Sequence, residues 1–140
     1  MSDRALRLTM AGLALTTVGI SSYLLQAHYA GSPVVCATGG CETVAQSRYS
    51  EIFGVPVALV GLLGSLAILA SLQLRDVLGR AAGVALTLSG LVFAAYLVLL
   101  QVFVIDAICE WCIANDVLLA ILAAFAVRRA YPETRFARAG

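Results

Sequence analysis

The sequence carries four cysteines in two closely spaced pairs, and their types and spacing point to thiol chemistry. Cys109 and Cys112 form a C-x-x-C motif at the start of a hydrophobic stretch, whereas Cys36 and Cys41 lie in a polar segment between hydrophobic stretches. Two cysteines separated by two residues can close a small reactive disulfide, and the free N–H groups at a helix start favour the thiolate. Four cysteines allow three pairings, and their number alone does not choose among them. The pairs could form a relay that works by thiolate attack through a mixed disulfide.

Other uses of four cysteines must be weighed against a relay. Two static disulfides could brace a loop outside the cytoplasm, where disulfides persist. Structural zinc ligands usually come in close cysteine pairs within a polar mini-domain, so a pair that starts a hydrophobic stretch disfavours zinc. Haem attachment needs a histidine after the second cysteine of the motif, and this chain has Ile113 there. Reactive and structural disulfides are the two interpretations that stay open.

The elements that must position these cysteines are membrane spans. The chain is 61% hydrophobic and 12% charged, with a mean hydropathy of +0.96, whereas a soluble domain is about half apolar and a quarter charged. Two uncharged runs, 52–74 and 81–105, exceed the roughly 20 apolar residues that a span needs. We expect one all-α integral membrane domain, residues 1–140, folded as a bundle of four transmembrane helices. The expected spans are 8–26, 55–74, 81–105 and 109–127, with an outer loop over 27–54.

The distribution of basic residues predicts the topology. All nine are arginines, and only Arg48 falls on the opposite side of a four-span chain from the others. The positive-inside rule then places both termini in the cytoplasm and the cysteines on the extracytoplasmic face of the inner (cytoplasmic) membrane. A basic start before a hydrophobic run is also typical of a cleaved signal peptide, but this run is long and no small-x-small site follows it. A net charge of +1, without a basic tract interleaved with aromatic residues, gives no support to nucleic-acid binding.

The outer loop contains signals for a tight ring and a short helix. Gly39 and Gly40 lie between the two loop cysteines, so a small ring can close without steric penalty. Thr43 and Gln46 fit a capping box, and apolar residues recur at helical spacing over 45–53. We expect a short amphipathic helix here, which either lies on the membrane over the outer mouth of the bundle or is an ordinary surface helix.

Two polar residues follow the C-x-x-C motif within the fourth expected span. Asn115 and Asp116 come three and four residues after Cys112, hence on the same helix face. At a rise of about 1.5 Å per residue, Cys112 would lie about 4.5 Å deeper than Cys109, which would face the aqueous loop. A lipid-soluble electron carrier such as a quinone could approach the deeper sulfur. Because an ionisable group in a span is costly, Asp116 is a candidate for hydrogen bonding or proton transfer near such a carrier. It could also be hydrated at the interface or pair with Arg48.

Taken together, these residues resemble the vitamin K epoxide reductase family, in its bacterial, quinone-linked disulfide-forming branch. The resemblance covers roughly 8–127. Its motifs are Cys36, Cys41 followed by Ser47-Arg48-Tyr49, Phe53-Gly54-x-Pro56 leading into a span, and C-x-x-C opening the last helix. It implies a four-helix bundle whose quinone pocket is capped by a short outer helix. It also implies a separate extracytoplasmic thioredoxin-like partner whose thiols are oxidised.

Carried onto this chain, the resemblance makes Cys36 and Cys41 the loop shuttle, with Cys41 exchanging with the second disulfide through Cys109. It makes Cys112 the sulfur beside the quinone. The candidate quinone-binding residues are Ser47, Phe53, Gly54, Asn115 and Asp116. The vertebrate enzymes have a tyrosine at the position of Asp116, so quinone reduction coupled to disulfide formation is favoured over epoxide reduction.

We therefore expect a membrane thiol oxidoreductase that passes electrons from its partner, through two cysteine pairs, to menaquinone, ubiquinone or phylloquinone. The alternative is a non-enzymatic membrane scaffold with structural disulfides. A small four-span transporter has less support, because the first three spans contain no acidic residue that could serve as a buried ion or proton site.

Overall fold

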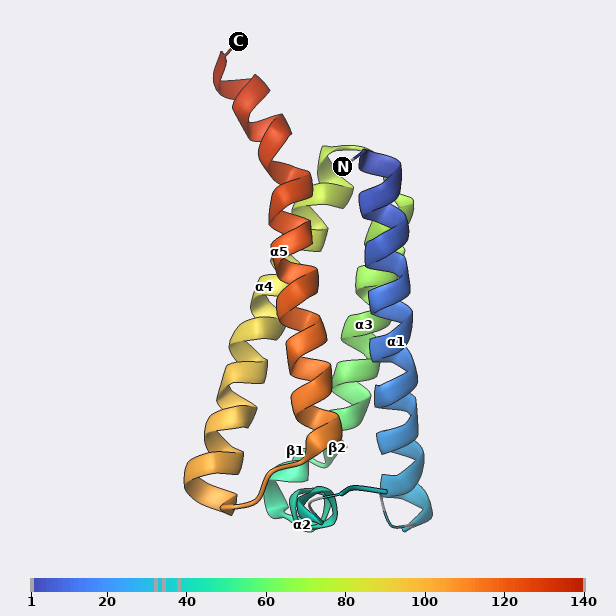
Figure 1. Ribbon diagram of the computed structural model, residues 1–140, viewed down its shortest axis with the longest axis vertical. Coiled ribbons are helices and arrows are strands. Elements are labelled where there is room, and N and C mark those ends of the chain that lie inside the picture. Colours follow the sequence, from blue (N-terminus) through green and yellow to red (C-terminus); the bar gives the residue numbers. More distant parts are fainter. Residues whose placement is uncertain (1, 32, 34, 38, 140) are drawn as a thin grey trace.

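The structure, a computed structural model, describes residues 2–31, 33, 35–37 and 39–139, and for 132–139 it describes the backbone alone. Within these ranges the chain is mostly helical (Figure 1). The elements in order are α1 (Asp3–Ala30), α2 (Gly40–Gln46), the 3-10 turn η1 (Arg48–Ser50), β1 (Glu51–Ile52), β2 (Val55–Pro56), α3 (Val57–Gln73), α4 (Val77–Leu99), the π-helical turn η2 (Leu100–Ile105) and α5 (Glu110–Ala139).

The four long helices lie side by side along the long axis of the molecule (Figure 1). Both α1 and α4 pack against α3 and α5. The main buried apolar cluster consists of Met10, Ala14, Ile68, Leu72, Leu122 and Ala126. These side chains come from α1, α3 and α5, and they fill the half of the bundle nearer the chain termini. The four cysteines lie in the other half.

Three helical segments are long and apolar enough to cross a membrane, namely Asp3–Ala30, Val77–Ile105 and Glu110–Tyr131. The fourth long helix, α3, is apolar but only 17 residues long. Large apolar side chains also point out of the bundle; Leu63 and Val92 are 57% and 73% exposed. Such apolar outer faces suit a lipid environment, because a soluble protein would leave them in water. The chain is a multi-pass membrane helical bundle.

Capping explains where the helices begin and end. The side chains of Ser2 and Asp76 accept hydrogen bonds from the first turns of α1 and α4 (3.2 and 3.1 Å). These two helices therefore start before the predicted spans 8–26 and 81–105, which marked only the apolar runs. α1 ends at Gly31, whose φ of 65° is the left-handed conformation that commonly stops a helix.

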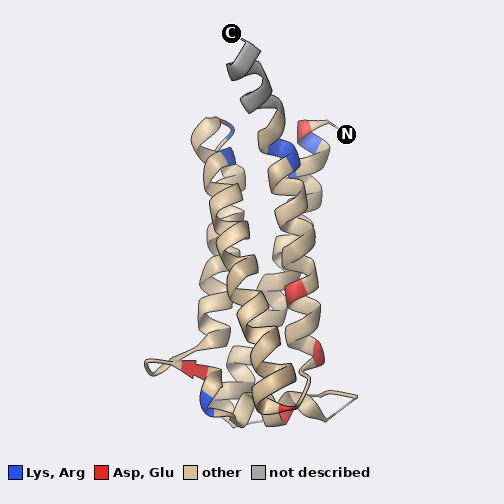
Figure 2. Cartoon of the chain, turned by 90° about the vertical axis from the view of Figure 1, so that its left-hand side faces the viewer, with Lys and Arg blue, Asp and Glu red and all other residues tan. Residues whose placement is uncertain are grey.

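Charged residues gather at the two ends of the bundle. Figure 2 shows basic residues at the end that carries both chain termini, opposite the segment containing α2. Arg48, in η1, lies in the segment at the other end. The long faces between the two ends are almost free of charge, as a membrane-embedded bundle requires.

The loop between α1 and α3 contains a short helix, but the predicted capping box is wrong. α2 begins at Gly40 after Gly39, whose φ is 74°, and no side chain caps it. Thr43 therefore lies inside the helix, and the Gln46 side chain donates to the Glu42 carboxylate (3.1 Å), whereas a capping box would have it accept from the backbone N–H of Thr43. The left-handed Gly39 starts the helix because glycine takes this conformation without steric cost.

The predicted amphipathic helix over 45–53 is also wrong. The chain leaves α2 at Gln46 and forms a two-stranded hairpin in which Glu51 pairs with Pro56 and Ile52 with Val55. Phe53 and Gly54 make the turn, with φ values of 52° and 80°. Two successive positive φ values are typical of the tight turns that join short antiparallel strands. Gly54 adopts its positive φ readily because glycine has no Cβ. The residue before a proline also avoids helical geometry, which favours the extended conformation of β2.

Candidate active site

All four cysteines lie together at the α2 end of the bundle. Cys36 and Cys41 form a disulfide with a Cα–Cα distance of 6.0 Å, and Cys109 and Cys112 are free thiols. Cys41 and Cys109 are 1% and 2% exposed and belong to one buried cluster with Ala27. Cys36 and Cys112 pack against this cluster. The fold thus gathers the two pairs in one place, as thiol exchange between them requires.

Cys109 is less accessible than its place at a helix start suggested. The sequence predicted that Cys109 would face the aqueous loop and that Cys112 would face the interior. Instead Cys109 is buried, Cys112 is partly exposed, and both line the same cavity. Depth along the helix axis is a poor guide here, because the cluster that includes Cys41 covers Cys109. Cys109 therefore packs beside Cys41 and has little contact with solvent.

Hydrogen bonds prepare Cys109 for reaction. The backbone N–H of Cys112 donates to Cys109 Sγ at 3.3 Å, and the backbone N–H of Cys109 donates to Gln101 Oε1 at 2.8 Å. A hydrogen bond from the Cys112 thiol, assisted by the N–H groups of Cys112 and Trp111, lowers the pKa of Cys109, although burial and Asp116 oppose the shift. A thiolate is the reactive form in disulfide exchange, so these contacts favour Cys109 as both leaving group and nucleophile.

Sequence reasoning missed Gln101. Its side chain is 2% exposed and lies in η2, where the helix widens to a π-helical turn before Asp106 takes a left-handed φ of 57°. The backbone N–H of Ala107 donates to the Gln101 carbonyl (3.1 Å), which fixes the turn that leads to Cys109. Such π-helical turns are frequent at functional sites. A lone amide side chain near the end of an apolar run was the available signal.

The segment around Cys36 is held by residues from two helices. The N–H of Val35 donates to the Tyr23 hydroxyl (3.0 Å), and the indole Nε1 of Trp111 donates to the Val35 carbonyl (2.6 Å). The N–H of Ala37 donates to Glu110 Oε2 (3.3 Å), and the Tyr23 and Trp111 rings lie 5.3 Å apart. Trp111 and Glu110, next to the C-x-x-C sulfurs in sequence, therefore hold the segment that carries Cys36 against the bundle.

The backbone next to Cys41 closely approaches the backbone next to the C-x-x-C motif. A Cβ atom on Gly40 would lie 2.9 Å from the backbone nitrogen of Ile108 and 3.0 Å from its carbonyl carbon. Only glycine leaves room for this approach. Because Gly40 precedes Cys41 and Ile108 precedes Cys109, the contact sets how near the two buried sulfurs can come.

A cavity of about 360 Å³ opens beside the thiols. Its polar lining includes Cys41, Cys109, Cys112, Ser47, Asn115 and Asp116. Much of the remaining wall is apolar and includes Ile68, Leu86, Phe93, Leu97, Leu100 and Leu119. A largely apolar wall with a few polar groups is typical of sites for flat hydrophobic ligands.

Two of the predicted binding residues lie away from this cavity. Phe53 is fully exposed at the tip of the hairpin, and neither Phe53 nor Gly54 contributes to the cavity wall. The hairpin turn carries them outward, whereas the predicted helix would have kept them near Ser47. Ser47 does line the cavity, and its hydroxyl donates to the Val44 carbonyl at 2.7 Å.

Asn115 and Asp116 face the cavity with unused polar atoms. Asn115 Oδ1 and Asp116 Oδ2 are buried and have no hydrogen-bond partner among the residues that the structure describes. The suggested pairing of Asp116 with Arg48 is wrong, because the Arg48 guanidinium donates to the Tyr49 hydroxyl (2.9 Å) and lies over its ring. Buried polar atoms are rarely left unpaired, so these two oxygens point to a ligand.

The comparison with known families agrees with this arrangement. The model of the vitamin K epoxide reductase family matches residues 8–127. These include both cysteine pairs, the loop that carries Cys36 and Cys41, and most of all four long helices. Members of this family are oxidoreductases that are generally linked to membrane quinones and thioredoxin-like partners. A match over most of the sequence that includes every cysteine leads to one conclusion. The chain belongs to the vitamin K epoxide reductase family.

Proposed function

We propose that this protein is a quinone-dependent oxidoreductase that oxidises an extracytoplasmic thioredoxin-like dithiol protein. The observation that carries the proposal is the burial of Cys41 against Cys109, beside an apolar cavity that Cys112 also lines. A static scaffold needs neither two free thiols next to a disulfide nor a cavity at their side.

The orientation follows from length and charge. At 17 residues, α3 is at the lower limit for a span, and with α3 as the fourth span both termini lie on one side. The positive-inside rule assigns the arginine-bearing end to the cytoplasm. The cysteines then face the extracytoplasmic side, where a partner dithiol and stable disulfides can exist.

Oxidation of the partner begins at the loop pair. The partner's thiolate attacks Cys36, which is more exposed than Cys41, and the Cys41 thiolate leaves. The partner's second thiol then attacks the mixed disulfide and releases Cys36. The partner gains a disulfide, and Cys36 and Cys41 become two thiols that hold the two electrons.

The second exchange passes these electrons inward. Cys41 attacks Cys109 of a Cys109–Cys112 disulfide and Cys112 leaves; Cys36 then attacks Cys41, and Cys109 leaves as a thiolate. The N–H of Cys112 at 3.3 Å from Cys109 Sγ favours that leaving group. The products are a closed Cys36–Cys41 disulfide and two thiols at positions 109 and 112, the state that the structure contains.

The cavity residues fit a quinone. Apolar side chains can enclose a flat ring, and a volume of about 360 Å³ is within the range of small-molecule sites. A protonated Asp116 would donate a hydrogen bond and then a proton to a ring oxygen, and Asn115 Oδ1 would accept from an O–H of the reduced ring, with Cys112 beside the ring. A bound quinone supplies a two-electron, two-proton acceptor, and menaquinone, ubiquinone and phylloquinone share this chemistry.

A single-turnover experiment tests the proposal. The purified protein is reduced with dithiothreitol, freed of reductant and mixed anaerobically with short-chain ubiquinone, and the quinone absorbance and remaining thiols are counted. We expect the wild type and Cys36→Ala to reduce the quinone, because both keep the inner pair. Cys112→Ala should reduce none. A Cys112→Ala variant with unchanged activity would overturn the proposal, and thiols inert to quinone in all three proteins would favour the scaffold.

A further inference from the structure

A second cavity, of about 560 Å³, lies at the end of the bundle opposite the cysteines. The first turns of α1 and the last turn of α3 form its wall, together with Arg75 in the turn between α3 and α4. Its wall includes Asp3, Arg4, Arg7, Leu8, Leu72 and Arg75. Three arginines around one cavity repel each other unless an anion binds among them. The question is therefore which guanidinium groups already have partners within the protein.

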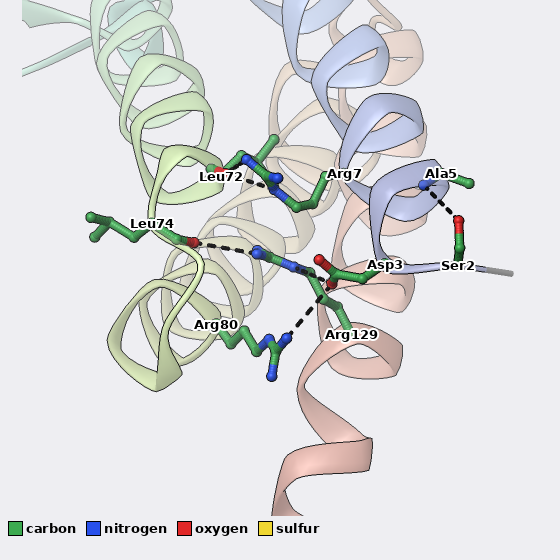
Figure 3. Close-up of polar contacts among 8 residues, drawn as sticks. All are labelled: Ser2, Asp3, Ala5, Arg7, Leu72, Leu74, Arg80 and Arg129. Atoms are coloured by element: carbon green, nitrogen blue, oxygen red, sulfur yellow. Dashed lines mark hydrogen bonds and ion pairs between the residues drawn. The ribbon is translucent and has the colours of Figure 1, made fainter.

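Some arginines at this end have a structural use. Arg7 Nε and Nη2 both donate to the Leu72 carbonyl (3.0 and 2.7 Å), and Arg129 Nη2 donates to the Leu74 carbonyl (3.3 Å), as Figure 3 shows. These carbonyls belong to the C-terminal end of α3, where the helix leaves acceptors unpaired and the dipole is negative. Arg7 and Arg129 thus cap α3.

The acid in the cavity wall, Asp3, is already paired. Asp3 Oδ1 accepts from Arg129 Nε at 3.2 Å and lies 3.8 Å from Arg80 Nη2 (Figure 3). It therefore offers little charge to the cavity. Arg4 and Arg75 are exposed and make no hydrogen bond or ion pair within the described ranges. Arg7 retains three N–H donors beyond the two that reach Leu72.

We propose that the cavity ringed by Arg4, Arg7 and Arg75 binds the phosphate of an anionic phospholipid headgroup. Guanidinium groups bind phosphate oxygens through paired, charge-assisted hydrogen bonds. Leu8 lines the same cavity and is 65% exposed, so it can meet the acyl chain of a lipid, which a free phosphate ion would lack. The positive-inside rule accounts for arginines at this end but not for three that converge on one cavity.

Lipid titration of the full-length protein in detergent, followed by native mass spectrometry, tests this site. The probe is dioleoylphosphatidylglycerol, with dioleoylphosphatidylcholine and inorganic phosphate as separate arms. We expect the Arg4→Gln/Arg75→Gln variant to bind the anionic lipid about 30-fold more weakly, since each arginine contributes about fivefold near an anionic headgroup. Its thermal unfolding midpoint without lipid should match the wild type, because both side chains are exposed.

Arg128→Gln is the matched control, because Arg128 is an exposed arginine near the same end that does not line the cavity. It should bind the lipid as the wild type does. An equal loss in Arg128→Gln, or no loss in the double variant, would overturn the proposed site. Displacement of the lipid by an equal concentration of inorganic phosphate would overturn the lipid as its occupant.

Discussion

The two ends of the bundle use polar side chains in different ways. At the arginine end, Arg7 and Arg129 donate directly to the last carbonyls of α3. None of the groups in these contacts is a cysteine, so disulfide exchange would not break them. At the cysteine end, Gln101 and Trp111 bind the backbone that carries the reactive sulfurs and leave the sulfurs themselves to exchange. The contacts that hold the fold are thus made by groups other than the sulfurs. A disulfide can therefore open or close without removing the hydrogen bonds that hold its segments.

The largest effect on stability should come from the arginine end. Arg129 is 4% exposed, and Arg129→Met removes its hydrogen bonds to Asp3 and Leu74. We expect the free energy of unfolding to fall by about 2–3 kcal/mol, because a hydrogen bond to a charged group contributes roughly 1.5–3 kcal/mol. Thermal or denaturant unfolding in detergent measures it. Arg128→Met, at an exposed neighbour, should change stability by less than about 0.5 kcal/mol.

Quinone reduction by the folded fraction of Arg129→Met should stay at the wild-type rate, because the substitution is remote from the cysteines. If the variant lost that activity while still folded, the two ends would be coupled and the separation drawn above would be wrong.

Gly40→Ala should affect chemistry more than stability. The added Cβ displaces α2 from the Ile108 backbone and moves Cys41 away from Cys109. We expect steady-state quinone reduction driven by dithiothreitol to slow roughly 10- to 100-fold, since small misplacements of reacting groups have effects of this size. Single-turnover quinone reduction by the prereduced Cys109 and Cys112 should be unchanged, because it needs no internal exchange.

Gly12→Ala controls for a general effect of replacing glycine, because a Cβ at Gly12 meets nothing within 4 Å. It should leave both rates at the wild-type level. A Gly40→Ala variant that slowed both reactions equally would indicate a structural defect and not a change in the exchange geometry.

A smaller effect is expected in the pH dependence of Cys109. Its lowered pKa populates the thiolate at lower pH, so iodoacetamide should alkylate Cys109 with a midpoint below that of an unperturbed thiol. Cys112→Ala removes the thiol hydrogen bond, and the midpoint should then move upward. Mass spectrometry of Cys109 alkylation across pH, with the Cys36–Cys41 disulfide closed, gives both midpoints. A wild-type midpoint above that of the variant would contradict the role given to Cys112.

The sequence was most informative where the structure is local. Long apolar runs with few or no charges predicted the four long helices, because burial of apolar side chains in lipid needs only composition and length. The cysteines, Ser47, Asn115 and Asp116 were predicted as site residues because their residue types are unusual beside or within such runs. All of these except Cys36 line the cavity.

The failures occurred where distant contacts determine the conformation. Spacing over 45–53 suggested a helix, but the Phe53–Gly54 turn and strand pairing gave a hairpin that removes Phe53 from the cavity. Gln101 reaches the N–H of Cys109 eight residues away through a π-helical turn, and Trp111 reaches Val35 across 76 residues. No regular period along the chain encodes such contacts.

Direct trapping of the internal disulfide gives the sharpest test of exchange between Cys41 and Cys109. The Cys36→Ala/Cys112→Ala variant keeps only these two cysteines, and diamide should join them rapidly into a disulfide that mass spectrometry identifies. In Cys36→Ala/Cys109→Ala, which leaves Cys41 and Cys112, a disulfide should form much more slowly. Failure to join Cys41 to Cys109, or equally fast joining of Cys41 to Cys112, would contradict the proposed route of electrons.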